Sequence, residues 1–339
     1  MKIVIEPGLT YNTDRALGIF TNELWQDLAI LAPGHQFFLL EDEKNAAEPT
    51  LKTLPVQKIR KTGIRWLDQR QLNKTLTSLA ADRFISPQPG GFCILTCSPE
   101  KGIAKRAAMA GRSVVFTGHT AGQTPGNSKP TPVITLVKPA CSPIITSLSW
   151  TEAESVKTQY TGGRSFFLFI GNISEPYQLV ALLKAFSIFK KWQQSNMQLV
   201  IAGYTTDWTE VFEEKLLHYK YRNDVVMIKN PASTEMAKLV AASYAVLYPA
   251  TENVFPLGLV WALQSHKAII AADSEVNRQL TTAAEWVDVN NTSDAFAKAM
   301  MLLYKDENRQ QWLVQQTRQT AHLFNRRQMM TEVWQCIEK

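Results

Sequence analysis

Short apolar runs alternate with amphipathic segments in the second half of the chain, and this alternation constrains the fold more than any other feature. Residues 166–171 are apolar throughout and end at a glycine, which is typical of a buried strand. Residues 179–192 follow, with apolar side chains three or four positions apart, the spacing of a helix. Further strands are predicted at 199–202, 225–228, 245–248 and 268–271, and helices at 208–217, 233–242 and 259–264. This succession predicts a doubly wound sheet of Rossmann type.

The first half carries a weaker version of the same pattern. Strands are predicted at 3–5, 37–40, 84–85, 92–95, 113–117 and 133–137, and helices at 21–31, 66–81 and 101–110. A capping-box pattern, Ser149 to Glu152, opens a helix that runs to residue 160. Helices at 292–305, 308–322 and 326–337 close the chain. We therefore expect an α/β protein with parallel sheets in two Rossmann-like domains, at 1–148 and 149–322, followed by a C-terminal helix within 323–339.

The composition excludes several classes of protein. Of 339 residues, 45% are hydrophobic and 19% charged, which is typical of a globular protein. The four cysteines are scattered, so we expect no disulfide framework, no metal and no cofactor. No signal peptide and no apolar run of the ~20 residues that span a bilayer is present, so we expect a cytoplasmic protein. The net charge is +6, but the sequence contains no nucleic-acid-binding motif, so we expect no nucleic-acid partner. The positive charge allows at most a peripheral contact with a membrane.

Residues 247–263 read Leu-Tyr-Pro-Ala-Thr-Glu-Asn-Val-Phe-Pro-Leu-Gly-Leu-Val-Trp-Ala-Leu. This segment resembles the donor-sugar motif of the GT-B glycosyltransferases of family 4, roughly Y-P-S-x-x-E-G-F-G-x-P-x-x-E-A-M. The matching positions are Tyr248, Pro249, Phe255 and Ala262. The resemblance covers the chain from about residue 166 onward. It implies two Rossmann-like domains that face a cleft, the first of them shortened around residues 123–132, and a last helix, within 323–339, that crosses back to the first domain.

Two segments of the first half resemble the family more weakly. Residues 17–25 look like the family's glycine loop and first helix, which places Gly18 in an N-terminal loop. Residues 113–119 look like the strand that ends in the family's His-Asp pair, with Thr120 in place of the aspartate. His119 is therefore a weak catalytic candidate, and a purely structural role for this histidine stays open.

The resemblance also implies where the diphosphate of a nucleotide-sugar would bind. The family holds this leaving group with an arginine and a lysine after the first strand of the second domain. Gly171 of that pattern is kept, whereas Asn172 and Pro176 stand at the two alternative arginine positions and Tyr177 stands at the lysine. Loss of two such cations removes roughly 3–6 kcal/mol of binding free energy. It also removes the electrostatic stabilisation of the departing group.

Two carboxylates of the family are replaced as well. Trp261 stands where a glutamate holds the ribose, and its indole would fill space that the sugar needs. Asn253 stands at the glutamate beside the transferred sugar, and its amide still offers a donor and an acceptor. Glu252, one position away, is the second weak catalytic candidate. No catalytic residue of the family pattern is intact.

Two main functions stay open, and a third, less favoured one is a different GT-B-like enzyme that uses another donor, for which the sequence offers no replacement set of residues. The first is a metal-independent glycosyltransferase that moves a hexose from a nucleotide-sugar to a saccharide or lipid-linked acceptor with retention, weakly or not at all because the donor-site charges are replaced. The second is a non-catalytic descendant of the fold, a pseudoenzyme that acts as a scaffold, as a regulatory partner of an active glycosyltransferase, or as a saccharide-binding module.

Overall fold

The computed structural model describes residues 1–6, 14–42, 54–60, 62, 65–88, 91–96, 112–116, 133–251 and 254–339. These residues form two compact units. The first contains the described residues up to Val137 together with Arg327–Lys339, and the second runs from Lys138 to Arg326. The helix predicted at 101–110 lies outside the described residues.

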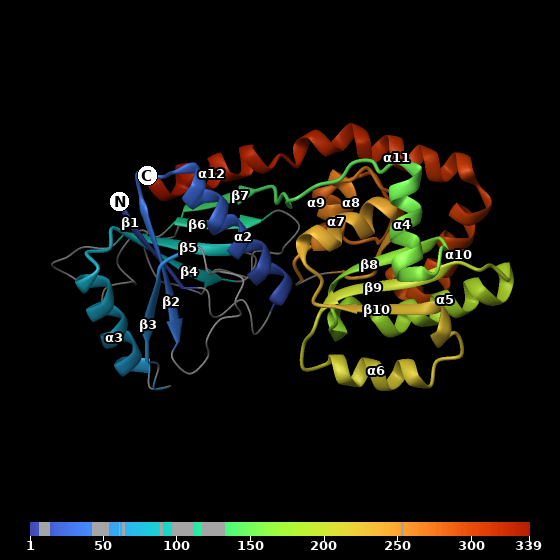
Figure 1. The fold of residues 1–339 in the computed structure, drawn as a ribbon, viewed down its shortest axis with the longest axis horizontal. Coiled ribbons are helices and arrows are strands. Elements are labelled where there is room, and N and C mark those ends of the chain that lie inside the picture. The colour runs from blue at the N-terminus through green and yellow to red at the C-terminus, as the bar shows by residue number, and fades with distance from the viewer. Residues whose placement is uncertain are drawn as a thin grey trace. The chain divides into compact units, whose positions relative to one another are not determined.

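The first unit contains a seven-stranded sheet in the order β3-β2-β1-β4-β5-β6-β7 (Figure 1). Its described strands are β1 (Lys2–Ile5), β2 (Gln36–Asp42), β3 (Val56–Ile59), β4 (Arg83–Gln88), β5 (Gly91–Thr96), β6 (Arg112–Phe116) and β7 (Val133–Val137). Its described helices are α2 (Arg15–Leu31), α3 (Arg65–Ser78) and α12 (Arg326–Glu338).

One strand of this sheet departs from the predicted parallel arrangement. β5 runs antiparallel to both β4 and β6. Only Pro89 and Gly90 separate β4 from β5 in the sequence, and two residues are too few for the crossover that parallel strands require. The remaining neighbours in the sheet are parallel.

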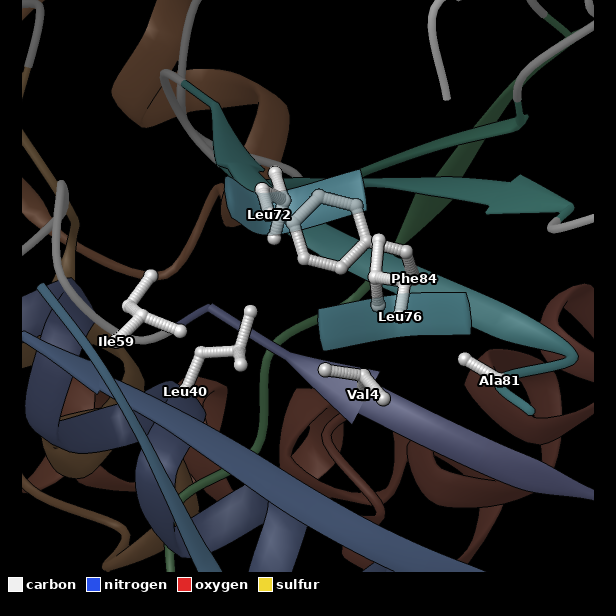
Figure 2. Close-up of a cluster of buried hydrophobic side chains, with 7 residues drawn as sticks. All are labelled: Val4, Leu40, Ile59, Leu72, Leu76, Ala81 and Phe84. Atoms are coloured by element: carbon white, nitrogen blue, oxygen red, sulfur yellow. The ribbon is translucent and has the colours of Figure 1, made fainter. Parts of the chain in front are cut away.

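An apolar cluster joins α3 to the sheet (Figure 2). Its members are Val4, Leu40, Ile59, Leu72, Leu76, Ala81 and Phe84. Ile59 belongs to β3, which the sequence did not predict because only the first and last of its four residues are apolar. Burial of such side chains, at about 25 cal/mol per Å² of apolar surface, holds the helix on the strands.

The helix α2 begins earlier than predicted, and this corrects the placement of Gly18. The Asp14 side chain caps the helix by accepting a hydrogen bond from the Leu17 N–H at 3.2 Å. The Gly18 N–H donates to the Asp14 carbonyl at 3.0 Å. Gly18 is therefore buried in the first turn of a helix and does not form the predicted N-terminal loop.

The last helix of the chain, α12, packs within the first unit. The Arg83 side chain donates to the carbonyl of Ile337 at 2.9 Å and to that of Glu338 at 3.2 Å. The Trp334 ring lies 4.8 Å from the His35 ring. A cation at these carbonyls satisfies groups that the helix terminus leaves free and complements its dipole.

The second unit contains a parallel six-stranded sheet in the order β10-β9-β8-β11-β12-β13 (Figure 1). Its strands are β8 (Phe166–Asn172), β9 (Gln198–Tyr204), β10 (Val225–Lys229), β11 (Ala245–Tyr248), β12 (Ile269–Ala272) and β13 (Glu285–Val287). Its α-helices are α4 (Trp150–Thr161), α5 (Leu179–Gln193), α6 (Thr209–Leu217), α7 (Ser233–Ala242), α8 (Leu257–Gln264), α9 (Glu275–Leu280), α10 (Thr292–Lys305) and α11 (Glu307–Thr320). This order confirms the predicted Rossmann-like sheet.

Local signals define the ends of these elements. The predicted capping box is confirmed, because Ser149 and Glu152 each satisfy the other's backbone N–H. Gly162, in the left-handed conformation at φ 58°, ends α4. Every residue of β8, β9, β11 and β12 is buried, as expected for central strands that are covered on both faces.

A buried lysine joins the segments that precede β9 and β10, at the amino-terminal edge of this sheet. The Lys190 ammonium donates to the carbonyls of Ser195 and Met197 and lies 3.1 Å from a carboxylate oxygen of Asp224. The side chain of Lys190 is 8% exposed. Its removal would leave buried acceptors without their donor.

We predict that Lys190→Met lowers the free energy of unfolding by about 2–3 kcal/mol, the range for hydrogen bonds from a charged donor. The neighbouring Lys191 is exposed, so Lys191→Met is a matched control that should change stability by less than about 0.5 kcal/mol. Chemical denaturation measures both values. Equal effects of the two substitutions would contradict the role of Lys190.

A second lysine should make stability depend on pH. Burial, and to a smaller extent repulsion by Lys157, lowers the pKa of Lys267 from 10.5 to about 8. Between these two pKa values the unfolded chain binds more protons than the folded one, so the free energy of unfolding rises with pH through this window. Lys267→Met should remove that rise and stabilise the protein at neutral pH by about 1–3 kcal/mol. The free energies of unfolding of wild type and Lys267→Met are measured at about pH 7.5 and at about pH 9.5. The stability advantage of the variant should shrink at the higher pH, and an advantage that is equal at both pH values would contradict the prediction.

Candidate functional site

In the second unit, the direction in which successive strands are added to the sheet reverses once, between β8 and β11. β8 is followed in sequence by β9 and β10 on one side, whereas β11, β12 and β13 extend the sheet on the other side of β8. In open parallel sheets, ligands bind beyond the carboxyl ends of the strands at such a switch point. The candidate site therefore consists of the segments that follow β8, β11 and β12.

The segment after β8 turns back at once through a short 3-10 helix, η3 (Glu175–Tyr177). Asn172 is the last residue of β8 and is 3% exposed, and its carbonyl accepts a hydrogen bond from the Ser174 N–H at 3.0 Å. Pro176 lies within η3, where its fixed φ suits the turn. The residues at the two alternative arginine positions thus lie at the end of β8 and within a tight turn, and the turn contains an acidic residue, Glu175, and no cation.

Tyr177, at the position of the family's lysine, is fully buried. Its hydroxyl donates to the carbonyl of Phe255 at 2.9 Å. Its ring meets Phe169 and Tyr248 edge-on, with centroid distances of 5.4 Å and 6.2 Å. The side chain contributes packing and a neutral hydrogen bond that joins the segment after β8 to the segment before α8.

The neighbouring glycine makes room for this ring. A Cβ atom on Gly171 would lie 2.7 Å and 2.9 Å from two ring carbons of Tyr177 and 3.0 Å from the Phe169 ring. Carbon atoms do not approach so closely without displacement of one partner. In this chain the glycine of the family pattern is therefore explained by the packing of Tyr177.

The amino terminus of α8 lies at the same edge of the sheet. Pro256 occupies the N-cap position and makes no side-chain capping bond, and the first turn holds no acidic residue. Among the described residues, the N–H groups of Gly258 and Leu259 donate to no backbone carbonyl, and both residues are buried. Uncapped N–H groups at the positive end of a helix dipole attract anions such as a phosphate.

Trp261 lies in α8, a helix whose residues are all buried, and is itself 3% exposed. Gln264, one turn further on, accepts a hydrogen bond from the Cys141 N–H at 2.7 Å and donates to the Phe324 carbonyl at 2.9 Å. The indole of Trp261 is thus part of a buried helix, and the side chain of Gln264 joins that helix to the segments that contain Cys141 and Phe324.

Asn277 in α9 is a site residue that sequence reasoning missed. Its Nδ2 atom donates to the carbonyls of Ala250 and Ala272, each at 2.9 Å, and so joins the segments after β11 and β12. The residue is 2% exposed. An asparagine within a short polar helix carries no signal for this role in the sequence, because the role depends on the adjacency of two strand ends.

One ion pair follows β12. The Arg278 side chain donates to both carboxylate oxygens of Asp273, and its guanidinium lies 4.6 Å from the centre of the Trp286 ring. The hydrogen bond from Arg278 lowers the pKa of the Asp273 carboxyl below its usual value. This arginine is therefore engaged by a carboxylate and a ring, although it lies on the side of the sheet where a phosphate would bind.

The remaining sequence-predicted residues are not placed. Glu252, Asn253 and His119 lie outside the described residues. Phe255 is buried and presents its carbonyl to Tyr177. Within the described part of the chain, no group of three or more histidine, cysteine, aspartate or glutamate side chains gathers in a way that would hold a metal ion.

Two Rossmann-like units in one chain are the architecture of the GT-B glycosyltransferases, and solved structures share it. HepE from Anabaena, solved with UDP and glucose, is 13% identical, with complete coverage of both chains and a TM-score of 0.71. A glycosyltransferase from Rickettsia africae is 12% identical over 99% of this chain and 97% of that chain, with a TM-score of 0.71. Sucrose-phosphate synthase from Thermosynechococcus elongatus is 11% identical over 99% of this chain and 98% of that chain, with a TM-score of 0.69.

A match over half of the sequence identifies the family of this chain. Residues 151–320 match the profile of the Glycosyl transferases group 1 family, and the chain belongs to that family. The search of curated proteins gave no significant match. Among the described helices, none combines the length and the apolarity needed to cross a bilayer.

Gly258 should be required for the position of α8. A Cβ atom there would lie 2.8 Å from the Ile170 carbonyl oxygen, in the backbone of β8. We predict that Gly258→Ala lowers the free energy of unfolding by about 1–3 kcal/mol, because the helix must move away from the sheet. Gly34 has no atom within 4 Å of its Cβ position, so Gly34→Ala should change stability by less than about 0.5 kcal/mol. Thermal and denaturant unfolding compare the two, and a neutral Gly258→Ala would contradict the close packing of α8 on β8.

Proposed function

We propose that this protein is a family 4 glycosyltransferase with a degenerate donor site, which binds a nucleoside diphosphate sugar beyond the carboxyl ends of β8 and β11 and transfers its hexose weakly or not at all. The observation that carries the proposal is the burial of Tyr177, whose hydroxyl is engaged by the Phe255 carbonyl where the family has a lysine. The reaction that remains would be a metal-independent transfer with retention to a saccharide or lipid-linked acceptor.

Donor binding is supported by the amino terminus of α8. Its N–H groups at Gly258 and Leu259 can donate hydrogen bonds to a phosphate without any cationic side chain. The family membership and the fold of HepE, which was solved with UDP-glucose, make a uridine diphosphate sugar the first ligand to test. A few neutral donors provide less binding free energy than an arginine and a lysine, so we expect weak affinity.

Weak transfer follows from the charge that develops on the leaving group. When the bond to the hexose breaks, a diphosphate with additional negative charge departs, and fixed cations lower the barrier of such a step. Asn172, Pro176 and Tyr177 carry no charge. Loss of one preorganised donor costs roughly 10²–10³ in kcat in other enzymes, and two positions are affected here.

The alternative is a non-catalytic protein that is derived from the same fold and acts as a scaffold, as a partner of an active glycosyltransferase, or as a saccharide-binding module. The presence of Trp261 where the resemblance expects a glutamate favours it, because α8 then offers no carboxylate to a ribose. The two proposals differ in one measurable property, which is affinity for the nucleotide.

Titration calorimetry with UDP, UDP-glucose and the corresponding GDP- and ADP-sugars tests donor binding. We predict saturable binding of at least one nucleotide-sugar, with turnover in sugar release at least about 100-fold below the common range of 1–10³ s⁻¹. Gly258→Ala should weaken binding and Gly34→Ala should leave it unchanged. Turnover within the common range would refute the weak-transfer proposal, whereas the absence of binding to every nucleotide would favour the non-catalytic alternative.

A further inference from the structure

The connection between β11 and α8 is tied on both flanks by side chains from neighbouring segments. β11 lies between β8 and β12 in the sheet. Tyr177, after β8, donates to the carbonyl of Phe255 near the end of the connection. Asn277, after β12, donates to the carbonyl of Ala250 near its beginning. The two hydrogen bonds therefore anchor the two ends of the same connection to different strands.

The bond from Tyr177 reaches the first turn of α8 through one further contact. The Phe255 carbonyl that accepts from Tyr177 also accepts from the Leu257 N–H at 2.8 Å. Leu257 is the first residue of α8, and the Val260 N–H closes the turn on the Pro256 carbonyl at 3.0 Å. The hydroxyl thus fixes the carbonyl from which this helix begins.

The bond from Asn277 has the corresponding effect at the other end. Its amide nitrogen bridges the Ala250 and Ala272 carbonyls, so the backbones after β11 and β12 are held at a fixed separation. Asn277 is itself held, because its N–H donates to the Ser274 hydroxyl that caps α9. A buried side-chain donor with two backbone acceptors constrains position more than a surface contact does.

We propose that Tyr177 and Asn277 are positioning residues, which hold the connection between β11 and α8 so that the N–H groups of the first turn of α8 face an incoming diphosphate. This inference rests on the proposed function. Neither side chain needs to touch the ligand, since both act through backbone carbonyls. Where the resemblance expects a lysine that contacts the diphosphate directly, Tyr177 would then act indirectly, through the Phe255 carbonyl.

The experiment compares Tyr177→Phe with a matched tyrosine elsewhere in the unit. Tyr219 also donates its hydroxyl to a backbone carbonyl, that of Leu183 at 2.7 Å. Tyr219→Phe therefore removes the same kind of bond far from α8 in the sequence, together with a hydrogen bond that the Tyr219 hydroxyl accepts from Ser187 at 3.0 Å. Hydrogen exchange should be about fivefold faster at the Leu257 and Val260 amides in Tyr177→Phe, the effect of one hydrogen bond on a local opening equilibrium. Tyr219→Phe should leave these amides unchanged.

Ligand affinity provides the second readout, with UDP as the probe. Tyr177→Phe and Asn277→Ala should each weaken UDP binding by at least about fivefold, whereas Tyr219→Phe should leave the dissociation constant within about twofold of wild type. A purely structural role would give the same affinity in all three variants after correction for unfolded protein.

The outcomes separate this inference from the proposed function. Unchanged exchange at Leu257 and Val260 in Tyr177→Phe would overturn the positioning role, whether or not UDP binds. Faster exchange with unaltered UDP affinity would overturn it as well. If wild-type protein binds no nucleotide, the proposed function and the inference that rests on it both fail, and faster exchange would then report only local packing.

Discussion

The hydrogen bond from Tyr177 to the Phe255 carbonyl organises the carboxyl edge of the second sheet. It joins the segments after β8 and before α8, which the Rossmann topology brings together at the switch point. The ring fills the interior between Phe169 and Tyr248, so the bond is shielded from water. A shielded bond in a low dielectric is stronger than an exposed one, so this bond holds the segment after β8 against the segment before α8.

Tyr177 provides packing and a neutral hydrogen bond at the position where the resemblance expects a cation. A lysine or arginine that awaits a diphosphate stays solvated or incurs a desolvation cost, and it repels any neighbouring cation. A tyrosine at the same position has no such cost, because its ring is buried and its hydroxyl is paired. If the resemblance places Tyr177 correctly, the absence of a cation and the gain of packing are two consequences of the same residue. That residue is one reason for the expectation of weak transfer.

The second unit could be predicted from the sequence because its central strands are buried on both faces and give continuous apolar runs. The bounds of α7, β11 and α10 coincide with those predicted. The edge strands β3 and β13 and the six-residue α9 are short and partly polar, and they gave no such signal. The sequence identified Tyr177 as a replaced lysine, but its partner lies 78 residues further along the chain. Only the paired strands bring the two together. The roles of Glu252, Asn253 and His119 stay predictions.

Gly171 shows why a matched motif position does not by itself carry the function of the motif. It agrees with the family pattern, yet a Cβ atom there would collide with the Tyr177 ring. The packing of that ring is therefore sufficient to require glycine, whatever the diphosphate requires. The spacing of the motif reports on strand ends, turns and helix starts, which are properties of the fold. The charged positions report on the chemistry, and the resemblance predicts that neutral residues occupy several of them in this chain. Membership of the Glycosyl transferases group 1 family thus indicates where a nucleotide-sugar would bind, and the neutral residues at that place limit what can happen to it there.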